Sequence, residues 1–205
     1  PKASTRMIKR IDVIYVGWGQ RWKLGYLAEN DEQILFEFSE EALKRQVDYS
    51  PIKMKLNLGS FGNFPDYLMR LPGFIYDHLP DGWGLLLMDK AFRRSGIRAI
   101  SPLDRLAFIG DKALGALSFE PSTHQELERQ YFTLLDLAKQ VVKILDEDPK
   151  TALNELVALG GCAQGARPKV LVDYNKKLKT ISTDPNKSEN PWLFKFPSQF
   201  EHKEV

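Results

Sequence analysis

One ten-residue stretch combines glycine, small side chains and fixed positive charge. It reads Gly160-Gly161-Cys162-Ala163-Gln164-Gly165-Ala166-Arg167-Pro168-Lys169. Glycine lets backbone N–H groups approach a ligand closely, and arginine and lysine side chains donate to phosphate oxygens. The stretch is therefore a candidate nucleotide-phosphate loop, although it matches neither the Walker A pattern nor the dinucleotide Gly-x-Gly-x-x-Gly pattern. A glycine-rich connector between a helix and a strand is the simpler interpretation of the same residues.

Lys195 is the second residue with unusual chemistry, because it stands among large apolar residues in Trp192-Leu193-Phe194-Lys195-Phe196. Burying an ammonium group is costly, so the side chain either reaches water at the strand end or points at an anion. A glycine loop, two strands joined by a turn, and a later strand with one lysine follow in the order of a protein kinase small lobe. In that lobe the loop covers the ATP phosphates and the lysine contacts them. The order of these elements therefore supports both the interpretation of the glycine stretch as a phosphate loop and that of Lys195 as a phosphate-contacting lysine.

Composition bounds the classes of function. The chain has 205 residues, of which 43% are hydrophobic, enough for a core in one large or two small domains. Lys and Arg number 29 against 27 Asp and Glu, so no direct contact with nucleic acid or anionic membrane is expected. The single cysteine excludes an internal disulfide, and the three histidines lack zinc-site spacing, so no metal site is expected. No apolar run reaches the roughly 20 residues of a membrane span, and we expect a cytoplasmic protein.

The elements that must position these residues predict an α+β protein. Residues 1–121 read as an antiparallel sheet with helices, and residues 122–205 as a second antiparallel sheet with helices, joined by a polar linker over 122–132. The expected strands are 11–16, 21–28, 33–38, a short one near 53–58, 114–120, 169–174, 178–182 and 192–196. The expected helices are 39–45, 74–79, 82–94 with Asp81 as cap, 102–110 with Ser101 as cap, 134–145 with Thr133 as cap, and 150–159.

Four stretches together resemble a known family, the HipA-like serine/threonine kinases of bacterial toxin–antitoxin systems. They are Leu79-Pro80-Asp81-Gly82-Trp83-Gly84, Asp104-Arg105-Leu106-Ala107-Phe108-Ile109-Gly110 with Gly115-Ala116-Leu117, Gly165-Ala166-Arg167-Pro168-Lys169, and Lys195-Phe196-Pro197. The resemblance covers nearly the whole chain from Ile11 onward. It implies a HipA N-terminal subdomain over 1–121 and an incomplete kinase small lobe, without the large lobe, over 122–205.

The resemblance also implies a nucleotide site. Gly161, Cys162, Ala163, Gln164, Gly165 and Lys169 look like the nucleotide loop, and Lys195 looks like the phosphate-contacting lysine. The implied cofactors are ATP and Mg²⁺, and the implied partners are a HipB-like antitoxin, which is a small DNA-binding protein, and a protein substrate. The implied role is a toxin kinase of the kind linked to bacterial persistence.

Two departures limit this expectation. Cys162 stands where some members carry a regulatory serine that becomes phosphorylated, so we do not expect loop phosphorylation. No His-Arg-Asp or Asp-Phe-Gly-like motif is visible, so we expect no catalytic residue in this chain and no catalysis by these residues alone. The chain is then the N-terminal portion of a longer kinase or half of a split system. The alternative is a non-catalytic interaction or antitoxin-like module that binds or restrains a separate kinase chain.

Overall fold

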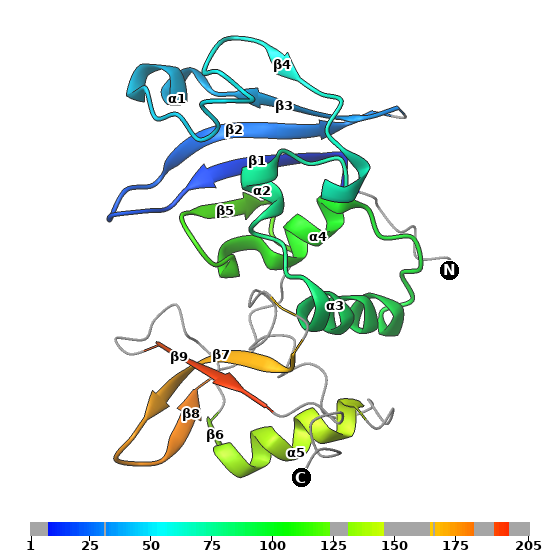
Figure 1. Cartoon of the computed structure of the whole chain (residues 1–205), viewed down its shortest axis with the longest axis vertical. Coiled ribbons are helices and arrows are strands. Elements are labelled where there is room, and N and C mark those ends of the chain that lie inside the picture. Colours follow the sequence, from blue (N-terminus) through cyan, green and yellow to red (C-terminus); the bar gives the residue numbers. More distant parts are fainter. Residues whose placement is uncertain are drawn as a thin grey trace. The chain divides into compact units, whose positions relative to one another are not determined.

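The computed structural model describes residues 8–30, 32–123, 131–145, 165, 167–182 and 191–196. It combines helices with antiparallel strands, which confirms the α+β class (Figure 1). The chain divides into two compact units, Pro1–Leu79 with Ala99–His124 and Pro80–Arg98 with Gln125–Val205. The expected boundary near residue 121 differs from this division, because residues 80–98 group with the second unit.

The first unit contains a five-stranded antiparallel sheet in the order β4-β3-β2-β1-β5 (Figure 1). Its strands are β1 (Arg10–Tyr15), β2 (Trp22–Glu29), β3 (Ile34–Phe38), β4 (Ser60–Phe61) and β5 (Leu117–Glu120). The expected meander of the first three strands is confirmed. The short strand expected near 53–58 is wrong, because the edge strand β4 forms later, where Phe61 pairs with Phe36. The last strand, β5, lies against β1, with Val13 opposite Phe119.

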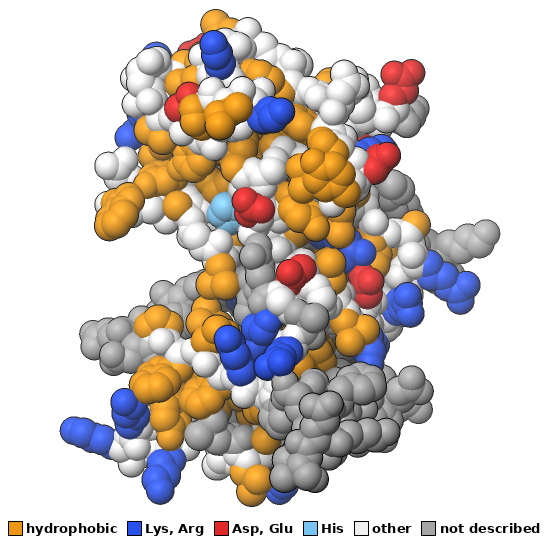
Figure 2. Space-filling view, viewed as in Figure 1, with side chains coloured by type: hydrophobic (Ala, Val, Ile, Leu, Met, Phe, Trp, Pro, Cys, Tyr) orange, Lys and Arg blue, Asp and Glu red, His pale blue; other side chains and the backbone are white. Residues whose placement is uncertain are grey.

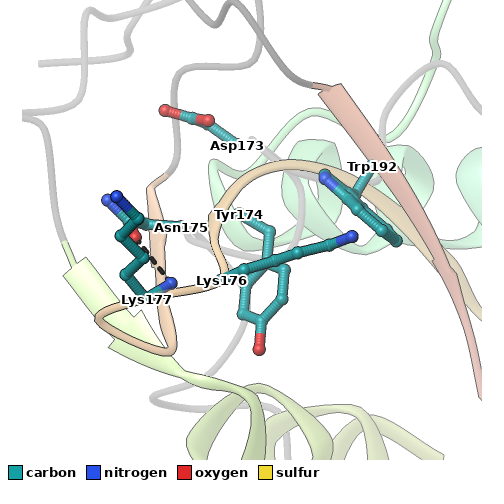
Figure 3. A pocket seen from close by; sticks show the side chains of 6 residues that line it. All are labelled: Asp173, Tyr174, Asn175, Lys176, Lys177 and Trp192. Atoms are coloured by element: carbon teal, nitrogen blue, oxygen red, sulfur yellow. Dashed lines mark hydrogen bonds between the residues drawn. The ribbon is translucent and has the colours of Figure 1, made fainter.

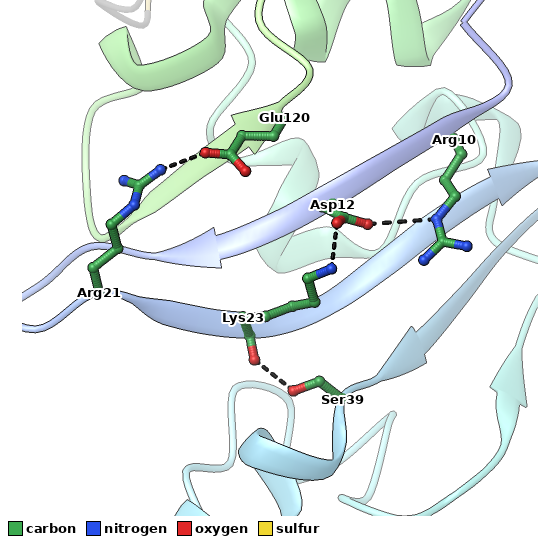
Figure 4. A network of polar contacts seen from close by, with 6 residues as sticks. All are labelled: Arg10, Asp12, Arg21, Lys23, Ser39 and Glu120. Atoms are coloured by element: carbon green, nitrogen blue, oxygen red, sulfur yellow. Dashed lines mark hydrogen bonds and ion pairs between the residues drawn. The ribbon is translucent and has the colours of Figure 1, made fainter.

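The two faces of this sheet differ in polarity. Ile11, Leu24 and Phe36 are fully buried on the core side. The other face carries ion pairs, with the Asp12 carboxylate between Arg10 and Lys23 (Figure 4). Exposed pairs of this kind contribute about 0–1 kcal/mol each, so the buried apolar face fixes the register of the strands.

Two helices in the first unit begin at the predicted caps Ser39 and Ser101, whereas the helix expected over 74–79 spans only Gly73–Tyr76 and follows Pro72 without a side-chain cap. The helices of this unit are α1 (Glu40–Arg45), α2 (Gly73–Tyr76) and α4 (Pro102–Ile109), with short 3-10 turns at Asp66–Leu68 and Gly110–Lys112. The Ser39 hydroxyl accepts from the Ala42 N–H at 3.1 Å. At α4, Ser101 and Asp104 form a capping box, in which each side chain accepts from the other's backbone N–H at 3.0 Å.

His78 and Gly115 are in close contact in the first unit. The His78 Nδ1–H donates to the Phe74 carbonyl, 2.8 Å away, and the ring stands edge-on to Phe119 with centroids 6.0 Å apart. Gly115 has φ +114°, and a Cβ there would lie 2.8 Å from His78 Nε2. Only glycine fits this backbone conformation and this space. His78 therefore has a packing role.

Replacing Gly115 with alanine should destabilise the chain. We expect Gly115→Ala to lower the free energy of unfolding by about 2–3 kcal/mol, because the left-handed backbone and the contact with His78 both oppose a Cβ. Gly96→Ala is the matched control, since Gly96 also has positive φ (+81°) but has open space around it. Urea unfolding measures both. Equal losses in the two variants would show that the His78 contact adds nothing.

Burial makes the stability of the first unit depend on pH through His78. Burial lowers the pKa of His78 below its ordinary value of 6.5, and the hydrogen bond to Phe74 only partly offsets this. The unfolded chain binds the proton more readily, so stability is complete above about pH 6.5 and falls as the pH drops below it. We expect this fall to shrink in His78→Asn, which keeps an N–H donor without titrating. Unfolding would be measured from pH 7.5 to 5 in a background carrying His124→Gln and His202→Gln. An unchanged pH slope in His78→Asn would contradict the assignment.

The second unit contains a four-stranded antiparallel sheet in the order β6-β8-β7-β9. Its elements are α3 (Gly82–Arg94), β6 (Tyr131–Thr133), α5 (Leu134–Leu145), β7 (Lys169–Asn175), β8 (Thr180–Ser182) and β9 (Pro191–Lys195). Thr133 caps α5 as expected, because its hydroxyl accepts from the Asp136 N–H at 3.1 Å. The expected linker is wrong at its end, where Tyr131 opens a strand that pairs with β8. The helix expected at 150–159 lies outside the described residues.

Candidate functional site

The pairing of β7 with β9 brings the two predicted site lysines together. Lys169 stands opposite Lys195, and Leu171 stands opposite Leu193. Residues directly opposite in an antiparallel pair project from the same face of the sheet. The two lysines and the two leucines therefore share one face, at the end of the sheet where β7 begins and β9 ends.

The two lysines differ in exposure. Lys195 is exposed, which agrees with the expectation that its ammonium group reaches water or an anion. The apolar neighbours in the sequence point to Lys195 as the lysine that could be buried. In the structure the buried lysine is instead Lys169, which is only 6% exposed. The backbone ladder continues past both residues, because the Phe196 N–H donates to the Pro168 carbonyl at 2.9 Å. The strand ends that carry the lysines are thus fixed by main-chain bonds.

Gly165 lies against the Lys169 side chain. Its φ is +106°, and a Cβ at this position would collide with the Lys169 ammonium nitrogen. The backbone conformation therefore favours glycine here, whereas the flexible lysine side chain could move aside for a Cβ. Of the predicted loop residues, the structure brings together Gly165, Lys169 and Lys195. Gly161, Cys162, Ala163 and Gln164 lie outside the described residues.

Asp81 is a contact of this site that the sequence did not predict. It occupies the position before α3 in extended conformation, but its side chain makes no capping bond to the helix. Its carboxylate accepts instead from the Gly165 N–H, 84 residues further along the chain. The Trp83 N–H donates to the Gly165 carbonyl at 3.5 Å. The expected capping role of Asp81 is therefore wrong, because the carboxylate is engaged by the glycine.

A pocket at the C-terminal end of β7 is lined by other kinds of residue. It is lined by Asp173, Tyr174, Asn175, Lys176, Lys177 and Trp192 (Figure 3). The Lys176 ammonium lies 4.4 Å from the centre of the Trp192 ring, a cation–π contact. The Asn175 side chain accepts from the backbone N–H groups of Lys177 and Leu178, both at 3.0 Å, and so fixes the turn. At about 3.3 Å per residue, this turn lies roughly 20 Å along the strand from Lys169 and forms a separate feature.

The described residues contain neither a metal-ligand cluster nor a membrane-spanning helix. Among residues 8–30, 32–123 and the described parts of 131–196, no group of three or more His, Cys, Asp or Glu could hold a metal ion. In the same part of the chain, no helix has the length and apolar character needed to cross a membrane.

The first unit has the architecture of a five-stranded antiparallel sheet with short helices, and the chain matches a known family over this unit and over α3. The family model described as HipA N-terminal domain matches residues 16–120, slightly more than half of the chain. The chain therefore belongs to the HipA N-terminal domain family. A comparison with curated proteins finds no match. The family match confirms the resemblance over the first subdomain, and it ends before Gly165, Lys169 and Lys195.

Proposed function

We propose that the chain is the N-terminal part of a HipA-like protein serine/threonine kinase, the toxin of a toxin–antitoxin pair, and that its second unit binds ATP phosphates. The observation that carries this proposal is the juxtaposition of Lys169 and Lys195 on one sheet face, beside Gly165 at positive φ. Membership of the HipA N-terminal domain family supports the assignment to this class of protein.

Charge makes this face suited to an anion. Lys169 and Lys195 stand directly opposite each other on neighbouring strands, so two positive charges lie close together on this face. The oxygens of a triphosphate would accept hydrogen bonds from both ammonium groups. The strand lysine of protein kinases contacts ATP in this way.

The neighbouring pair on the same face is apolar. Leu171 is half-buried and Leu193 is 48% exposed, and they stand directly opposite each other, one step along the face from the lysines. Apolar side chains beside a phosphate site suit the flat ring of a purine. ATP would bring Mg²⁺ chelated by its phosphates. Residues that hold the metal and position the acceptor hydroxyl are absent from the motifs of this sequence, so we propose that a second lobe supplies them.

Lys195 provides the test of this function. In the complete gene product, we expect Lys195→Ala to reduce ATP-dependent phosphate transfer to protein by about 100-fold, because it removes a charge that stabilises the transferring phosphoryl group. Lys177→Ala is the matched control, since Lys177 is an exposed lysine on the turn after β7. Transfer would be followed with ATP labelled at the γ-phosphate, and ATP affinity by calorimetry. Unchanged transfer in Lys195→Ala would refute the role of Lys195.

A second candidate function is supported by the surface of the first unit. Its large exposed apolar side chains include Trp18 at 94%, Ile52 at 87%, Leu58 at 78% and Tyr67 at 78%. Figure 2 shows hydrophobic side chains at the molecular surface. Trp18 stands in the turn between β1 and β2 with φ +53°, and exposed tryptophans are enriched at protein interfaces. We propose that this unit contacts a protein partner, either an antitoxin that is a small DNA-binding protein or a separate kinase chain.

Trp18 should be an anchor of that contact. We expect Trp18→Ser to weaken binding to the product of a neighbouring antitoxin or kinase gene at least tenfold, through loss of its apolar surface. Leu178→Ala is the control, because Leu178 is 71% exposed but lies on the turn between β7 and β8. Co-purification followed by calorimetry measures the effect. Equal partner binding by Trp18→Ser and the control would exclude Trp18 from the interface.

A further inference from the structure

We infer that Asp81 is a positioning residue for Gly165 and Lys169, and that the Gly165 N–H is held by Asp81 instead of donating to phosphate. The inference deepens the phosphate site proposed above and, where it concerns ATP, rests on that proposal. It begins from the hydrogen bond between the Gly165 N–H and the Asp81 carboxylate. Both residues belong to the same compact unit.

The hydrogen bond commits the only donor that Gly165 has. One backbone N–H serves one strong acceptor, and a carboxylate is a stronger acceptor than a neutral oxygen. A phosphate oxygen would have to displace Asp81 to reach this N–H. Gly165 therefore does not act as an amide donor to the nucleotide while this hydrogen bond is formed.

Gly165 is held from its second backbone group as well. The Trp83 N–H reaches the Gly165 carbonyl at 3.5 Å, so both polar groups of the glycine face the start of α3. The beginning of α3 is buried, because Trp83 is 2% exposed and Leu87, one turn further along, is fully buried. The beginning of α3 therefore forms a fixed base for the glycine.

Fixing Gly165 also fixes Lys169. The Lys169 ammonium packs against the Gly165 Cα, where any Cβ would collide with it. Because Asp81 fixes the position of Gly165, it also limits the positions that the Lys169 ammonium group can take beside that glycine. Asp81 therefore acts on phosphate through the lysine, and contributes no direct contact with the nucleotide.

The hydrogen bond can be observed directly and without nucleotide. Gln164–Gly165 is the only Gln–Gly pair in the sequence. Labelling glutamine with carbonyl ¹³C and glycine with ¹⁵N therefore selects the Gly165 amide in an NMR spectrum of the 205-residue chain. We expect its proton signal to move upfield in Asp81→Ala, and to move less in Asp81→Asn, whose amide oxygen still accepts. A Gly165 signal that is the same in wild type and Asp81→Ala would overturn the inference.

ATP affinity tests the consequence for the site in the complete gene product. We expect Asp81→Ala to weaken ATP binding about tenfold, and Asp81→Asn to restore it to within about threefold of wild type. Asp48→Ala is the matched control, because Asp48 also accepts from a backbone N–H, that of Ser50, but in the first unit. Tighter ATP binding by both Asp81 variants would overturn the inference, since the carboxylate would then compete with phosphate. Failure of the wild-type protein to bind ATP would refute the proposed function, while the NMR signal would still decide whether Asp81 holds Gly165.

Discussion

The antiparallel pairing of β7 with β9 is the constraint on which the candidate site depends. A slip of one residue would send Lys169 and Lys195 to opposite faces of the sheet, because side chains alternate along a strand. The register is held from the other face, where the Tyr174 ring meets Phe194 edge-on at 5.4 Å and Trp192 stacks on Phe194 at 6.3 Å. Aromatic packing on one face thus places two cations together on the other.

Features encoded by neighbouring residues could be predicted from the sequence, and features made by distant segments could not. The capping box of Ser101 and Asp104 lies within four residues, so its pattern is visible in the chain. The place of β5 beside β1 and the late position of β4 depend on which edge of the sheet is free. No local pattern in the sequence reports that choice, and the short strand near 53–58 was therefore misplaced.

The same limit applies to the candidate site. The apolar neighbours of Lys195 in the sequence suggest burial, yet Lys169 is the lysine that is buried. The amino-acid sequence of a strand does not show which of its two faces another element covers. The contact between Asp81 and Gly165 spans 84 positions, and Asp81 has all the features of an ordinary helix cap. Only the folded chain shows that its carboxylate is used elsewhere.

That contact also changes how the family match relates to the folded units. The match over residues 16–120 includes α3, but α3 groups with the second unit, and its Trp83, Leu87 and Met88 are buried. A polypeptide that ended near residue 121 would keep α3 and lose the remainder of the unit with which α3 groups. It would also lose Gly165, and with it the hydrogen bonds of Asp81 and Trp83 at the start of α3.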